Sequence, residues 1–258
     1  MLEHKKIQNL SDYFVELNSR REKGVYFYRI NGYSEEVGEF IKKYYDTARR
    51  TGVVIEGKIP NPDEGNLAYY NEIMGMDFQM SMDFIHVSLR KWLPRMNEFQ
   101  RQNVAASIYD SLDSLRKAGK TENMLRNAYI KFMCWLYYKF ERIVNQLGEN
   151  HIPKILYEGQ ISNYELMLIS ILSNAGCDVV LLQYAGDQGY LKTDPGSVLS
   201  DSLQMEGLQP FPQGYCVKKV RDEIQNELNN ERLYGIRPSL TNCTNCLLYT
   251  SPSPRDVE

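Results

Sequence analysis

The stretch HIPKILYEGQISNYELMLISILSNAGCDVVLLQYAGDQGY, residues 151–190, decides the fold that we expect for this chain. Its first apolar run predicts a strand over residues 154–158, which a glycine then ends. Ser162 and Glu165 form the pattern S-x-x-E, in which the serine oxygen accepts a backbone N–H and the glutamate reaches back to the cap residue. This pattern predicts a helix that begins at Ser162.

The remainder of the stretch completes a strand–helix–strand unit. Apolar residues lie on more than one face of the predicted helix, as in a helix packed between layers, and Gly176 follows the last of them as a C-cap. Residues 179–182 form an unbroken apolar run, which is typical of a parallel strand covered on both faces. Residues 152–184 thus predict a βαβ unit and a Rossmann-like α/β fold with a parallel sheet.

Ligands of open α/β sheets gather at the carboxyl ends of the strands, where the loops after these two strands would meet. The loop at residues 157–160 leads into a helix N-terminus, whose N–H groups and partial positive charge suit a phosphate or a carboxylate. The loop at residues 183–190 carries Asp187, which, like Glu158, would accept ribose hydroxyls or hold a cation. The candidate ligand-binding residues of the two loops are Glu158, Gly159, Gly186, Asp187 and Gly189.

A structural interpretation of these loops competes with the functional one, because turns after strands require glycines in any case. The loops contain neither G-x-G-x-x-G nor G-x-x-x-x-G-K-[ST], so that neither the dinucleotide nor the P-loop mode of phosphate binding is indicated. The sequence also shows no pairing of a nucleophile with a base and, apart from one C-x-x-C near the C-terminus, no metal-ligand spacing. It therefore assigns no catalytic residue, no cofactor and no metal.

A second strand–helix–strand pattern precedes this unit, over residues 25–56. The predicted elements are a strand over residues 25–30, a helix over 34–50 and a strand over 53–56. Arg29 and Asn31 share one face near the end of the first of these strands. Arg29 is the first candidate for binding an anionic ligand, with Asn31 beside it. The competing interpretation pairs Arg29 with a surface carboxylate.

Helical periodicity dominates the middle of the chain, at residues 66–148. Predicted helices there cover residues 84–92, 99–117 and 121–147. A further helix is predicted over residues 11–23, and another over 217–233 after a long irregular segment. The expected architecture is therefore a parallel sheet interrupted by a helical middle segment.

These elements divide the chain into five parts. They are an N-terminal α/β part at residues 1–65, a helical segment at 66–148, a βαβ part at 149–215, the start of a C-terminal region at 216–245 and a tail at 246–258. The βαβ part either belongs to the same sheet as the first part or forms a second α/β lobe.

The tail requires separate treatment. Residues 246–256, CLLYTSPSPRD, resemble a translated sequencing adapter, so we expect the native protein to be represented only to about Asn245 and exclude the tail from fold reasoning. Cys243 and Cys246 form C-x-x-C, a spacing used by zinc and redox sites. The pair is either an accident of the adapter or a real pair that lacks a second pair of ligands.

Net charge, apolar runs and cysteine usage indicate which classes of protein the chain does not resemble. The formal net charge is −3, which indicates neither nucleic-acid binding nor attraction to anionic membranes. No apolar run approaches the roughly 20 residues that span a bilayer, and the polar N-terminus lacks the apolar stretch of a secretory signal. Five scattered cysteines without such a signal predict a cytoplasmic protein with no disulfide framework.

Three strings of residues resemble a known family. They are YFYRINGY at residues 26–33, WLPRM at 92–96, and the segment from ILYEG at 155–159 to GCDV at 176–179. The resemblance is to the bacterial YceG-like family and extends from residue 7 to about residue 240. It implies a cytoplasmic component of a biosynthetic module in tellurium-resistance (ter) gene clusters, beside stress-response proteins. Family members are longer than this chain, and the resemblance brings no established reaction.

Two functions of different classes remain. In the first, the protein is an enzyme or enzyme subunit of a biosynthetic pathway, and it binds a phosphorylated or nucleotide-like ligand through Arg29, Glu158, Gly159 and Asp187. In the second, it is a non-catalytic scaffold that docks other ter-cluster proteins through the helical middle segment. The absence of catalytic motifs favours the scaffold, and the family association favours the biosynthetic component, which is the preferred interpretation.

Overall fold

The computed structural model describes residues 1–61, 67–148 and 150–247, with side chains as far as residue 233. Five parallel strands form one sheet in the order β2-β3-β4-β1-β5. The strands are β1 (Phe27–Ile30), β2 (Val53–Glu56), β3 (Lys154–Glu158), β4 (Asp178–Leu182) and β5 (Asp201–Ser202). The predicted α/β fold with a parallel sheet is confirmed.

The stretch that decides the fold forms the predicted βαβ unit. Strands β3 and β4 are neighbours, and α7 (Asn163–Ala175) connects them. Ser162 is the N-cap of α7 and forms the full capping box with Glu165. Gly176 ends the helix with a φ of +134°, a conformation that L side chains rarely adopt.

The second predicted pattern is also confirmed, although its two strands are not neighbours. Helix α1 (Glu35–Thr51) follows β1 and leads to β2, and β3 and β4 lie between these strands in the sheet. Gly52 stands at the turn from α1 into β2, where a Cβ atom would lie 1.8 Å from the carbonyl oxygen of Lys154. Only a glycine fits this close approach of two backbones.

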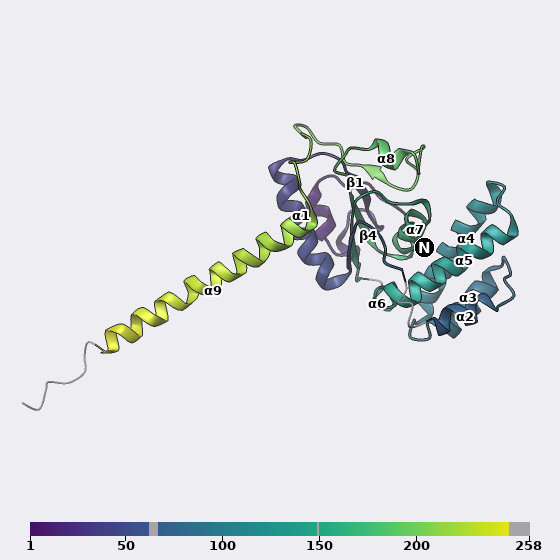
Figure 1. The fold of residues 1–258 in the computed structure, drawn as a ribbon, viewed down its shortest axis with the longest axis horizontal. Helices are drawn as coiled ribbons and strands as arrows, with labels where there is room; N and C mark the ends of the chain where they lie inside the picture. The colour runs from purple at the N-terminus through teal and green to yellow at the C-terminus, as the bar shows by residue number, and fades with distance from the viewer. Residues whose placement is uncertain (62–66, 149, 248–258) are drawn as a thin grey trace, which may run out of the picture. The chain divides into compact units, whose positions relative to one another are not determined.

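The strand connections lead to opposite faces of the sheet. The chain passes from β1 to β2 in one direction along the sheet, and from β2 through β3 and β4 to β5 in the other. Because parallel crossovers are right-handed, the two directions place their helices on opposite faces. Helix α1 covers one face and α7 the other (Figure 1). The connection that follows β1 and the connection that follows β4 therefore cross opposite faces of the sheet. Since β1 and β4 are neighbours, the carboxyl ends of these two strands form a topological switch point.

The helical middle segment lies on the α7 side of the sheet, where α4 packs against α7 (Figure 1). Its elements are α2 (Ala68–Met74), α3 (Met82–Trp92), α4 (Glu98–Lys117), α5 (Glu122–Trp135), the π-helix η3 (Leu136–Phe140) and α6 (Glu141–Val144). The prediction of one helix over residues 121–147 is wrong in its middle, where η3 separates α5 from α6. This wider turn accompanies a stack of Tyr137 on Tyr69, with ring centres 3.9 Å apart.

The prediction of a helix over residues 11–23 is wrong. Two short 3-10 helices, η1 (Leu10–Phe14) and η2 (Leu17–Ser19), occupy this segment instead. Asn9 caps η1, and Tyr13 and Leu17 point into the core. The side chain of Arg20 bonds to the carbonyl oxygen of Val15 and to a buried aspartate. These tertiary contacts override the helical pattern of the sequence.

The irregular segment after β4 contains two short elements that were not predicted, α8 (Gln188–Leu191) and β5. The chain divides into two compact units, Met1–Tyr215 and Cys216–Glu258. The first contains the whole sheet, to which residues 1–65 and residues 149–215 both contribute strands. The second contains α9 (Val217–Leu247), which includes the predicted helix over residues 217–233.

Two predictions, on the Cys243–Cys246 pair and on the C-terminal tail, concern residues that the structure does not describe in full. The side chains of Cys243 and Cys246 are not described, nor is most of the tail at residues 246–258.

Within the described ranges, every helix is too short or too polar to cross a bilayer.

Candidate functional site

Arg29 and Asp187, two of the predicted site residues, form an ion pair at the carboxyl edge of the sheet. Arg29 lies in β1, and Asp187 follows the neighbouring strand β4. The guanidinium donates from Nε to Oδ1 and from Nη2 to Oδ2, both at 2.8 Å, so that the contact is bidentate. The Arg29 side chain is 2% exposed and the Asp187 side chain 21%.

The other donors of Arg29 tie the chain after β4 to β1. Nη1 donates to Ser197 Oγ at 2.9 Å, and to the carbonyl and the hydroxyl of Ser200 at 2.6 and 2.9 Å. The guanidinium also lies 4.1 Å from the centre of the Tyr190 ring. The Tyr190 hydroxyl in turn donates to Asp194 and accepts from Ser200. Arg29 therefore fixes residues 187–200 onto the sheet.

The same pair sets the charge at this edge. Hydrogen bonds from Arg29, together with its charge, hold the pKa of Asp187 below its usual range, although burial acts in the opposite direction. Asn31 contributes to the lower pKa of Asp187 by a further hydrogen bond. Its amide also donates to Ser202 Oγ at 3.1 Å. Asp187 is thus an ionised acceptor at neutral pH.

The loop after β3 carries the second group of predicted residues. Glu158 ends β3 and accepts a hydrogen bond of 2.6 Å from the hydroxyl of Tyr184, which follows β4. Gly159 adopts a φ of +97°, and its carbonyl accepts from Gln183 Nε2 at 2.9 Å. The loops after β3 and β4 thus lie side by side.

Gly186 and Gly189 shape the loop after β4. Gly186 has a φ of +85°, and its N–H donates to the carbonyl of Gln183 at 3.1 Å. Gly189 faces the other loop, since a Cβ atom there would lie 3.3 Å from Gln160 Nε2. All the predicted site residues therefore lie at one edge of the sheet. Their role in ligand binding stays a prediction.

The N-terminus of α7, which the sequence suggests as a phosphate site, holds a carboxylate of the chain itself. Glu165 Oε2 accepts from the N–H and the hydroxyl of Ser162 at 3.0 and 2.6 Å. Its Oε1 accepts from the N–H of Ile59 at 2.6 Å. Because Glu165 is buried, a phosphate at this helix end would face a negative charge in a region of low dielectric.

Four aromatic residues that the sequence did not single out gather at the same edge. Tyr33 follows β1, and its ring centre lies 5.7 Å from that of Phe211 and 5.3 Å from that of Tyr215. The ring centre of Tyr184 lies 4.9 and 5.7 Å from the same two rings. All four side chains are half-buried. The available signal was that Tyr33 and Tyr184 each follow a strand end.

The edge therefore combines aromatic rings with ionised or hydrogen-bonded carboxylates. Aromatic faces bind the apolar faces of planar or sugar rings, and carboxylates accept hydrogen bonds from hydroxyl groups. As far as the side chains are described, no cluster of three or more histidine, cysteine, aspartate or glutamate residues is arranged to hold a metal ion.

Comparison with known proteins gives one informative result. The chain matches the model of the YceG domain over residues 5–227. Neither the curated proteins nor the solved structures contain a match. The matched residues include every strand of the sheet, the helical segment and all the predicted site residues. The chain therefore belongs to the YceG domain family.

Proposed function

We propose that this protein is a ligand-binding component of a biosynthetic module in bacterial tellurium-resistance gene clusters. In this proposal, a nucleoside- or sugar-like ligand binds at the carboxyl edge of β1, β4 and β3. Membership in the YceG domain family supports the link to the module. The observation that carries the binding site is the hydrogen bond between Tyr184 and Glu158 beside the cluster of half-buried aromatic rings.

The position of these residues supports the proposal. The connections after β1 and β4 diverge to opposite faces, and open α/β sheets bind ligands at such switch points. Tyr33 and Tyr184 lie directly after these two strands, and Glu158 ends the next strand. A ligand ring would lie against the aromatic side chains while its hydroxyl groups donate to Glu158 and Asp187.

The charges at this edge favour hydroxyl groups over phosphate. Arg29 already donates to Asp187, Ser197 and Ser200. The N-terminus of α7 already holds the buried Glu165 carboxylate. We therefore assign the ring and the hydroxyl groups of the ligand to this edge, and not its phosphate.

Ligand binding by the intact protein tests this proposal. The probes are adenosine, guanosine, uridine and ribose, with binding measured by saturation-transfer NMR and by the shift in unfolding temperature. At least one probe is expected to bind the wild type. Glu158→Gln is expected to weaken that binding about tenfold or more, since hydrogen bonds to charged groups contribute about 1.5–3 kcal/mol.

The matched control is Glu39→Gln, which removes an equal charge from an exposed position on α1. It is expected to bind the probe as the wild type does. Failure of every probe to bind, or equal affinity of the wild type and Glu158→Gln, would overturn the proposal. Such a result would favour the scaffold function, in which the helical segment docks other ter-cluster proteins.

A further inference from the structure

A buried ion cluster lies at the opposite, amino edge of the sheet. Asp178 begins β4, is fully buried, and accepts from Arg20 Nη1 at 2.9 Å and from Lys154 Nζ at 2.5 Å. It also accepts from the backbone N–H of Tyr26 at 2.9 Å. Two buried cations therefore share one carboxylate. Burial lowers the pKa of Lys154, against the attraction of Asp178.

Arg20 retains a donor that the cluster does not use. Its Nε donates to the carbonyl of Val15 at 3.1 Å, and Nη1 donates to the carbonyl of Gly24 at 2.8 Å as well as to Asp178. Nη2 donates to Asp178 alone. Because a guanidinium has five N–H groups, one N–H on Nη2 has no acceptor among the residues that the structure describes.

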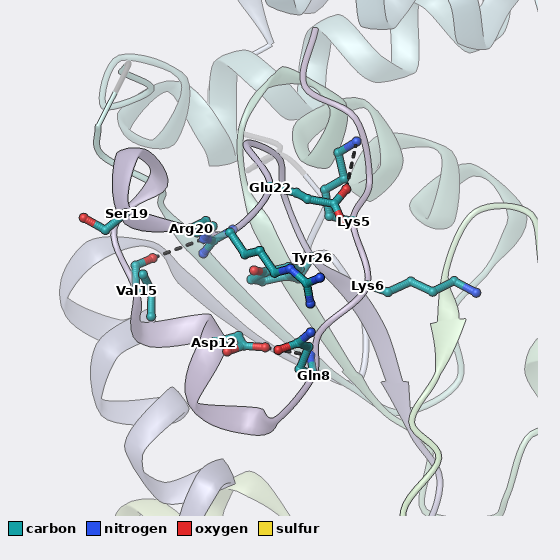
Figure 2. A pocket seen from close by; sticks show the side chains of 10 residues that line it. Lys5, Lys6, Gln8, Asp12, Val15, Ser19, Arg20, Glu22 and Tyr26 are labelled. Carbon is teal, nitrogen blue, oxygen red and sulfur yellow. Dashed lines mark hydrogen bonds and ion pairs between the residues drawn. The ribbon is translucent and has the colours of Figure 1, made fainter.

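A hollow of about 250 Å³ lies beside this cluster, and Arg20 lines it (Figure 2). Arg20 and Tyr26 are its buried lining residues, and the Arg20 guanidinium lies 4.1 Å from the centre of the Tyr26 ring. Lys6 and Arg21 are exposed cations at its rim. None of the site residues predicted from the sequence lines this hollow.

The two carboxylates that line the hollow already have partners. Asp12 Oδ2 accepts from the backbone N–H groups of Gln8 and Asn9 at 2.6 and 3.1 Å. Glu22 lies 3.6 Å from Lys5 Nζ. Lys6 and Arg21, by contrast, have no ion partner within the described part of the chain. The balance of charge around the hollow is therefore positive.

We propose that this hollow binds the phosphate group of a small phosphate monoester. The unused N–H of Arg20 would donate to one phosphate oxygen from the buried side, and Arg21 would pair with the dianion from the rim. The side chain of Lys6 extends away from Arg20 (Figure 2) and would add only to the positive charge nearby. The side-chain amide of Gln8 lies in the same lining and supplies a further donor. The bound phosphate would thereby balance the excess positive charge of the ion cluster.

Calorimetric titration of the intact protein with inorganic phosphate and with glycerol 3-phosphate tests this site. Both probes are expected to bind with one-to-one stoichiometry. Arg21→Gln is expected to weaken binding about tenfold, as the loss of one charge-assisted hydrogen bond predicts. Both Arg21 and Lys6 are exposed, so that their glutamine variants are expected to fold as the wild type does.

The matched control is Arg90→Gln, an exposed cation on α3 that does not line the hollow. It lowers the net charge equally and is expected to leave the affinity unchanged. If Arg90→Gln and Arg21→Gln weaken phosphate binding equally, the binding reflects only the general attraction of an anion to a positively charged protein. That result would overturn the proposed site. Absence of binding at millimolar phosphate would also overturn it.

Sedimentation with vesicles of phosphatidic acid in phosphatidylcholine identifies the source of the phosphate group. Binding to the free monoesters without binding to vesicles supports a soluble ligand. Vesicle binding that Arg21→Gln abolishes supports the same phosphate site with a lipid headgroup as its source. In either case, NMR shifts at Gln8 and Arg21 on addition of phosphate are expected to locate the ligand, and shifts confined to other residues contradict the assignment.

Discussion

At the scale of single residues, the ion pair between Arg29 and Asp187 makes a testable contribution to stability. The folded-state pKa of Asp187 is below its usual value, so its contribution is present above about pH 4 and is lost as the pH falls through the folded-state pKa. Asp187→Asn is expected to cost about 2 kcal/mol at pH 7. Urea unfolding at decreasing pH should show the gap between wild type and variant narrowing below about pH 4.

Asp46→Asn is the control for this prediction. Asp46 pairs with Arg49 and Arg50 on the exposed side of α1, so its loss is expected to change stability by less than 1 kcal/mol. A gap for Asp187→Asn that stays constant from pH 7 to pH 3 would contradict the assigned role of the pair.

The same pair shows what the sequence predicts at this scale. Arg29 and Asp187 were each identified from their positions at strand ends, and both lie at the carboxyl edge. Their contact could not be predicted, because the two residues are 158 positions apart and meet only because β4 lies beside β1. The ion cluster around Asp178 was missed for the same reason, although a charged residue at the start of an otherwise apolar strand was a visible signal.

At the scale of elements, the capping box of α7 also links the helix to a distant segment of the chain, through the hydrogen bond from the Ile59 N–H to Glu165. Ser162→Ala removes the cap together with the hydrogen bond from the Ser162 hydroxyl to Glu165, and is expected to cost about 1–2 kcal/mol. Glu165→Ala also leaves the buried N–H of Ile59 without its acceptor, and is expected to cost about 2–3 kcal/mol. Chemical denaturation measures both free energies of unfolding.

Ser34→Ala at the start of α1 is the matched control, because the Ser34 hydroxyl accepts only from the N–H of Val37. Its loss is expected to cost about 1 kcal/mol and no more than Ser162→Ala, which also loses the hydrogen bond to Glu165. If Glu165→Ala costs no more than the two serine variants, the link between α7 and the segment after β2 contributes nothing to stability.

Local signals determined how well individual elements were predicted. Caps and periodicity located α1, α3, α4 and α7 to within about two residues. The segment at residues 11–23 has a similar pattern, yet it forms η1 and η2. The reason is that Tyr13 is buried in the core and Arg20 forms an ion pair with the buried Asp178. Strand β5 has two residues and pairs only with β1, so that no periodicity marks it in the sequence.

At the scale of the whole molecule, the sequence predicted a parallel sheet and a helical segment but not their arrangement. The strand order depends on pairing between distant segments. In the strand–helix–strand pattern at residues 25–56, the two strands β1 and β2 are separated in the sheet by β3 and β4. The helical segment enters between β2 and β3, and its apolar side chains join those of the sheet and α7 in one core. The aromatic cluster likewise required the fold, since Tyr33 and Phe211 are far apart in the sequence.

This shared core predicts that the sheet and the helical segment unfold together. The chain has two tryptophans, Trp92 and Trp135, and both lie in the helical segment, so their fluorescence reports on that segment alone. Amide hydrogen exchange of β3 and β4 reports on the sheet. Because residues of both parts bury one another, the two probes are expected to give the same denaturation midpoint. A fluorescence change that is complete while the β3 and β4 amides remain protected would show instead that the helical segment unfolds as a separate unit, and that its packing against α7 adds little to the stability of the sheet.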